Sequence, residues 1–125
     1  MRKWILRVLL LALAISAGAT TVFALIPGNV GGQGGDFWHW VAFVTLGVLS
    51  RLTFSRISFL LLWVLLIVFG GAIELAQGIL NTMREMDVRD LQVDAFASFV
   101  GLLVGAVILA LYRRLRDRNG TEAGV

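Results

Sequence analysis

Hydrophobic positions gather into four long stretches along the chain, separated by short polar segments. The stretches cover residues 4–26, 37–52, 57–80 and 91–112. Because a helix rises about 1.5 Å per residue and the bilayer core is roughly 30 Å thick, a membrane span needs about 20 residues. Three stretches reach this length, while the second has only about 16 residues and would thin the bilayer or extend into the preceding loop. The pattern predicts an all-α polytopic membrane bundle with four transmembrane helices.

The segments between the stretches carry residues that interrupt membrane helices. Residues 27–35 are rich in glycine and contain the single proline, residues 51–56 form a basic turn, and residues 81–90 form a mixed-charge loop. Residues 113–125 are basic and polar, and we expect them to form a disordered cytoplasmic tail. The sequence has no internal repeat, so it predicts a single transmembrane domain over residues 1–112.

The overall composition is that of a membrane protein. Hydrophobic residues make up 58% of the 125 residues and charged residues only 15%. A soluble domain of this size would need far more polar surface, and a disordered chain would have far fewer apolar residues. The chain has no cysteine, which excludes a disulfide framework and a cysteine-based metal site. The net charge of +3 comes from basic residues at the ends of apolar stretches, so it indicates orientation and no nucleic-acid partner.

The distribution of lysine and arginine predicts which side of the membrane each loop faces. Nine of the eleven basic residues lie in the N-terminal segment, the 51–56 turn and the C-terminal tail, whereas Arg84 and Arg89 share a loop with acidic residues. By the positive-inside rule, both termini lie in the cytoplasm and both long loops face outward. The first stretch also contains a signal-peptide-like sequence at 17–19, but its apolar run continues to Ile26, which favours a retained span.

Polar and ionisable residues gather at the outer ends of three stretches. At helical spacing, these polar groups line up with small residues deeper in the membrane. Small residues let helices approach closely, so we expect the helices to pack through these stripes and to gather the polar groups into one outward-facing pocket. The predicted packing residues are Gly47, Gly70, Gly101 and Gly105. The candidate ligand-binding residues are Asp36, His39, Glu74, Gln77, Arg84, Asp90 and Asp94.

These polar residues also have structural interpretations. His39 lies beside two tryptophans and suits an interfacial aromatic belt. Glu74 and Gln77 could form hydrogen bonds between helices. Asp90 and Asp94 could cap the fourth helix, because carboxylates suit the positive end of its dipole. An ionisable residue within a span is nevertheless a functional hypothesis by default, and the convergence of these groups on one side favours a binding site.

At these residues the chain resembles the VanZ-like family of small bacterial membrane proteins, in three short blocks. The first is an acidic residue followed by His in an aromatic-rich span, and the second is Glu-x-x-Gln late in a span. The third is an Arg followed by two spaced polar residues before a glycine-rich span. The matching residues are, in order, Asp36, His39, Glu74, Gln77, Arg84, Asp90 and Asp94, followed by Gly101 and Gly105. The chain lacks the Lys that often precedes the family's His, and Asp94 stands at the usual Asn position.

The resemblance implies a multi-pass protein of the bacterial cytoplasmic (inner) membrane, in the context of the cell envelope. The founding member of the family is associated with low-level resistance to the glycopeptide teicoplanin, and no biochemical mechanism is generally assigned to the family. Since a family does not fix a function, the chemistry has to be argued from the residues.

The residues favour a binding or accessory protein, with membrane lipids, a lipid-linked envelope precursor or a membrane protein as partner. Arg84 would contact a phosphate, and the carboxylates would accept hydrogen bonds from hydroxyls or amines. The alternative is a membrane-embedded enzyme acting on a lipid phosphate, in which His39 and the carboxylates act as acid–base groups or hold Mg²⁺. A transport component and a purely structural role also fit. One His with carboxylates makes a poor zinc site, so we expect no cofactor and no metal.

Overall fold

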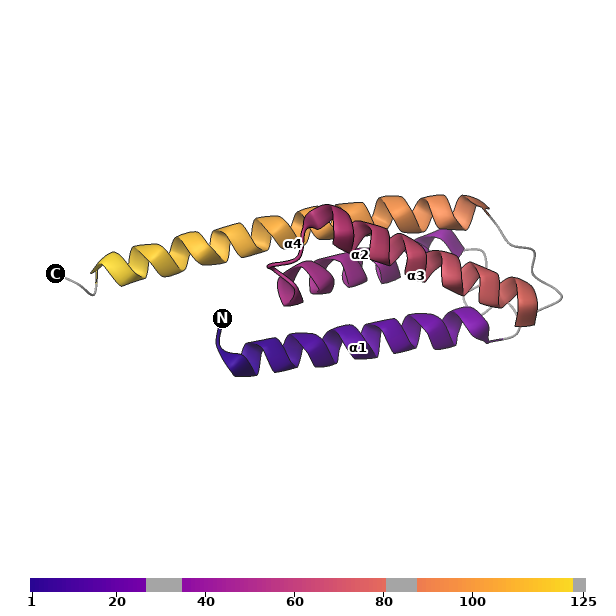
Figure 1. Cartoon of the computed structure of the whole chain (residues 1–125), viewed down its shortest axis with the longest axis horizontal. Helices are drawn as coiled ribbons and strands as arrows, with labels where there is room; N and C mark the ends of the chain where they lie inside the picture. The colour runs from indigo at the N-terminus through magenta and orange to yellow at the C-terminus, as the bar shows by residue number, and fades with distance from the viewer. Residues whose placement is uncertain (27–34, 81–87, 123–125) are drawn as a thin grey trace.

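The computed structural model describes residues 1–26, 35–80 and 88–122. Within these ranges the chain forms four helices and no strand, which confirms the all-α prediction. The helices are α1 (Lys3–Leu25), α2 (Gly35–Thr53), α3 (Phe59–Leu80) and α4 (Val88–Glu122). They follow the four apolar stretches of the sequence and form an elongated bundle (Figure 1).

Three of these helices are long and apolar enough to cross a membrane. They are Lys3–Leu25, Phe59–Leu80 and the Val88–Gly120 part of α4. The 19-residue α2 carries charged residues in both its first and its last turn, and it does not belong to this set. Three spans are therefore supported by length and composition, and the fourth span stays a prediction.

The expectation of a disordered tail after residue 112 is wrong for the part of the tail that the structure describes. α4 continues without interruption through the basic segment to Glu122. Arginine and leucine are good helix formers, and the segment contains no proline. Extending a helix that has already formed avoids the cost of nucleation, so the polar composition of the segment does not stop it.

Successive helices alternate in direction along the chain (Figure 1). α2 and α4 run the same way, and α1 and α3 run opposite to them (Figure 1). Residue pairs across α2 and α4 keep a nearly constant separation in sequence, 53 residues between Asp36 and Arg89 and 55 between His39 and Asp94. Both termini lie at the same end of the bundle, where α4 extends beyond the other helices (Figure 1).

Glycine residues bring the backbones of α2 and α4 into direct contact. A Cβ atom on Gly47 would lie 2.6 Å from the carbonyl oxygen of Ser98 and 2.9 Å from the Cα atom of Gly101. A Cβ atom on Gly101 would in turn overlap the carbonyl oxygen of Val44. Such an approach requires residues without side chains, as in the GxxxG contacts of membrane helices. The structure therefore places these two glycines where the sequence analysis expected helix packing.

The apolar core surrounds this contact, and most other large apolar side chains point outward. The core cluster consists of Phe43, Leu46, Leu62, Leu66, Ala97 and Leu102. Side chains such as Leu60, Val68 and Val107 are well exposed, as expected for helices that face lipid. α1 has no buried residue, so it lies at the periphery of the bundle.

Two side-chain hydrogen bonds tie α3 to its neighbours. The indole Nε1 of Trp63 donates to the carbonyl oxygen of Ala95 in α4 at 2.8 Å. The amide Nε2 of Gln77 donates to the carbonyl oxygen of Ala24 in α1 at 2.7 Å. In an apolar environment, few other groups compete for these donors, so both bonds help to hold α3 in place.

Replacing Gly101 by alanine should destabilise the bundle, because the new Cβ would force α2 and α4 apart. Overpacking of this kind costs about 1–3 kcal/mol of unfolding free energy. Gly18→Ala is the matched control, since a Cβ at Gly18 meets nothing within 4 Å. Unfolding of the purified variants in mixed micelles, followed by circular dichroism, measures both. Equal stability of the two variants would contradict the close contact.

Candidate functional site

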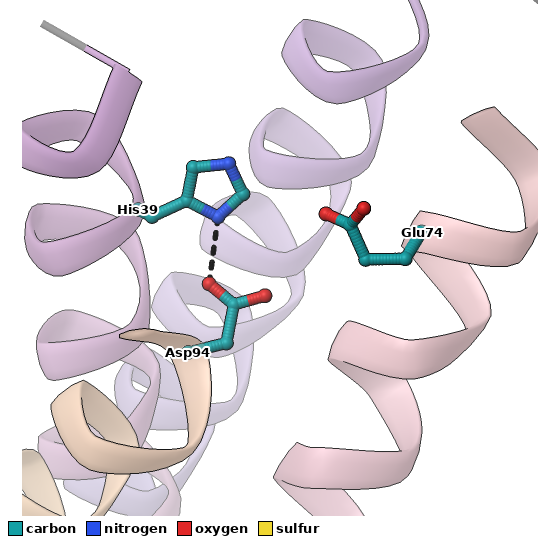
Figure 2. Close-up of side chains that lie close together, drawn as sticks. All are labelled: His39, Glu74 and Asp94. Atoms are coloured by element: carbon teal, nitrogen blue, oxygen red, sulfur yellow. Dashed lines mark hydrogen bonds and ion pairs between the residues drawn. The ribbon is translucent and has the colours of Figure 1, made fainter. Parts of the chain in front are cut away.

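Three ionisable side chains from three different helices converge inside the bundle. They are His39 of α2, Glu74 of α3 and Asp94 of α4, and one ligand atom from each lies within 4.8 Å of the others. Glu74 and Asp94 are 3% and 1% exposed, while the His39 side chain retains an exposure of 16%. Figure 2 shows the imidazole above the Asp94 carboxylate, with the Glu74 carboxylate pointing toward both. We call these three residues the polar cluster.

The glycine contact between α2 and α4 accounts for the meeting of His39 and Asp94. Asp94 lies seven residues before Gly101, and His39 lies eight residues before Gly47. Both spacings are close to two helical turns, so in a parallel pair the two side chains lie opposite each other. The Nδ1 atom of His39 is 2.7 Å from the Oδ1 atom of Asp94, a charge-assisted hydrogen-bond distance.

The second carboxylate oxygen of Asp94 is buried against α3. Its Oδ2 atom has no hydrogen-bond partner in the described part of the chain. A Cβ atom on Gly70 would lie 3.0 Å from this oxygen, so the glycine makes room for the carboxylate one turn before Glu74. Asp94 lies beyond the first turn of α4, which rules out helix capping as its role, whereas Asp90 does lie in that turn.

The polar cluster carries more negative than positive charge when its carboxylates are ionised. Glu74 and Asp94 provide two carboxylates, and His39 provides at most one positive charge. Asp90 adds a further carboxylate, with its Oδ2 atom 3.7 Å from the His39 Nε2 atom. Such a site suits hydrogen-bond donors and cations, and it would repel an anion that arrived without a counter-cation.

At the rim of the same end, Asp36 pairs with Arg89. The Arg89 guanidinium donates to the Asp36 carboxylate at 2.8 Å, and the two side chains are 72% and 48% exposed. By sequence, Arg89 falls in the predicted 81–90 loop and is not among the candidate ligand-binding residues. Its place opposite Asp36 follows from the parallel register of α2 and α4, which sequence alone does not reveal. Arg84, the predicted phosphate contact, lies outside the described residues.

Gln77 and the pocket that the structure describes do not belong to the polar cluster. Gln77 is buried, but its amide donates to α1 and thus ties helices together. A pocket of about 630 Å³ lies at the opposite end of the bundle, and Thr53, Arg56, Arg113 and Arg116 are among its lining residues. At the acidic end the polar cluster is largely buried, with His39 as its most exposed member, and the neighbouring Asp90 side chain is 24% exposed.

No protein-family model, curated protein or solved structure matches this chain. The resemblance to the VanZ-like family therefore stays a prediction from short sequence blocks.

Asp94→Asn should lower the unfolding free energy by about 2 kcal/mol, because it weakens a buried hydrogen bond to a carboxylate. Asp36→Asn is the matched control, since it removes the same charge from an exposed pair worth at most about 1 kcal/mol. The micelle unfolding assay used for the glycine variants compares the two. Equal losses would show that the buried His39–Asp94 pair contributes no more to the unfolding free energy than the exposed Asp36–Arg89 pair does.

Proposed function

We propose that the chain is a multi-pass protein of the bacterial cytoplasmic membrane that binds the polar head of an envelope lipid or of a lipid-linked precursor. The burial of His39, Glu74 and Asp94 together in an apolar bundle supports this proposal. Ionisable groups are costly within a membrane, and proteins rarely place three of them together without a role. Helix packing alone needs only the glycines and the apolar core.

The proposed ligand offers hydrogen-bond donors to the polar cluster. Hydroxyl and amine groups of a head group would meet the carboxylates of Glu74 and Asp94, which accept hydrogen bonds. The exposed guanidinium of Arg89 adds positive charge at the rim, where a phosphate of the same head group would lie. By sequence, Arg84 is a further candidate for this contact.

In the proposed orientation the polar cluster faces outward and both termini lie in the cytoplasm. The excess of arginine at the other end, which includes the pocket residues Arg56, Arg113 and Arg116, favours a cytoplasmic face in contact with anionic lipids. α2 would be the fourth span. Its 19 residues cover about 28 Å, close to the thickness of the bilayer core, and Phe43 and Leu46 bury it in the bundle.

The family resemblance adds an envelope context to the proposal, and with it a link to glycopeptide (teicoplanin) resistance. A second candidate function is an enzyme that acts on a lipid phosphate. The 2.7 Å contact between His39 and Asp94 favours it, because a carboxylate that orients an imidazole is a common part of acid–base sites.

Native mass spectrometry of the protein in nanodiscs extracted without detergent tests the binding function. We expect a discrete lipid or lipid-linked adduct on the wild-type protein and its loss in Glu74→Gln, which removes one cluster charge and keeps the side-chain size. Asp117→Asn is the matched control at the opposite end of the bundle, and it should retain the adduct. A bare wild-type protein, or the same adduct on both variants, would contradict the proposal.

Single cysteines test the orientation, since the natural chain contains none. A membrane-impermeant maleimide should label Val88→Cys in intact cells and should label Arg56→Cys and Arg118→Cys only after permeabilisation. Labelling of Arg56→Cys in intact cells would mean that α2 does not cross the membrane, because a three-span topology places residue 56 outside.

A further inference from the structure

We propose that His39, Glu74 and Asp94 together hold one divalent metal cation, through which the polar cluster contacts its ligand. This inference rests on the head-group site proposed above and assigns it a metal that the sequence analysis did not expect. The three side chains come from three helices, so a cation would also tie α2, α3 and α4 together at this end.

The donor set and its spacing suit a divalent cation. One imidazole nitrogen and two carboxylate oxygens are ligands that Mn²⁺ and Zn²⁺ accept, and Mg²⁺ accepts the carboxylates. Ligand atoms on one such ion lie at most about 4.4 Å apart, which is twice a bond of about 2.2 Å. The donor atoms of the polar cluster lie within 4.8 Å of one another, so small side-chain rotations suffice to close the site.

The buried Oδ2 atom of Asp94 is a second observation that points to a cation at this position. This oxygen belongs to a side chain that is 1% exposed, and it has no hydrogen-bond partner among the described residues. Figure 2 shows it on the side of Asp94 that faces Glu74, away from the oxygen that contacts His39. A buried carboxylate oxygen requires a donor or a cation, and a metal between Asp94 and Glu74 would supply one.

A divalent cation also reduces the negative charge of the polar cluster. Glu74, Asp94 and the neighbouring Asp90 provide three carboxylates against one imidazole, and a divalent cation offsets part of this negative charge. Two buried carboxylates repel each other in a medium of low dielectric constant, and a cation between them reduces that repulsion. The cation therefore gives a physical reason for keeping both carboxylates buried.

Three protein ligands leave coordination positions open on the metal. Sites of this kind keep a position for water or for an oxygen atom of the ligand. Phosphate oxygens are hard donors that bind such cations readily, so the metal would let a net-negative cluster hold the phosphate-bearing head of a lipid. The proposed ligand class is thus a phosphorylated head group bridged to the protein through the metal.

Metal titration of the full-length protein in nanodiscs tests this proposal directly. We expect one Mn²⁺ per chain by electron paramagnetic resonance and elemental analysis, with competition by Zn²⁺ and Mg²⁺ showing which ion binds best. Glu74→Gln, Asp94→Asn and His39→Gln should each weaken Mn²⁺ binding at least about tenfold. Asp117→Asn removes a carboxylate elsewhere and should leave the affinity unchanged. Circular dichroism checks that each variant is folded. Glu74→Gln is the variant that decides the test, because it removes one proposed metal ligand and leaves the His39–Asp94 hydrogen bond in place.

Two results would overturn the metal site. One is a wild-type protein that binds none of the three cations, and the other is Mn²⁺ binding that Glu74→Gln does not weaken. Chelation separates this failure from failure of the proposed function. If the wild-type protein keeps its lipid adduct in EDTA, the head-group function stands without the metal. If EDTA releases the adduct and Mn²⁺ restores it, the metal bridge is supported. If no adduct forms with or without EDTA, the proposed binding function fails as well.

Discussion

The side-chain-free contact between Gly47 of α2 and Gly101 of α4 is the constraint on which the rest of the structure depends. It brings two parallel backbones together and fixes their register, since a Cβ atom at either position would collide with the opposite helix. Two turns away, this register sets His39 against Asp94, and further out it sets Asp36 against Arg89. Packing and the candidate chemistry therefore share one cause.

The two ends of the bundle differ in a way that a membrane protein can use. One end holds buried carboxylates and an imidazole, and the other holds a pocket lined by Arg56, Arg113 and Arg116. The basic end suits the cytoplasmic face and its anionic lipids. The acidic end is costly to build in an apolar environment, and this cost is the strongest physical argument that the polar cluster serves to bind a ligand or a cation.

Much of the fold could be predicted from the sequence, because helices and their apolar faces leave a local, periodic pattern. The positions of all four helices and the glycines of the packing stripes follow from that pattern. The tail after residue 112 was misjudged as disordered, because its polar composition was given more weight than the helix propensity of arginine and leucine. Arg89 was missed because its partner is 53 residues away, on another helix.

The sequence by itself determined that this is an all-helical chain of membrane-protein composition, with ionisable residues at one end of its spans. These properties depend on composition and on spacing within one helix. Only the tertiary structure decided which of those residues meet: His39, Glu74 and Asp94 share one buried cluster, Gln77 bonds to α1, and Asp36 stays at the rim. The physical reason is that the register between helices is set by non-local backbone contacts, and no pattern within a single helix encodes it.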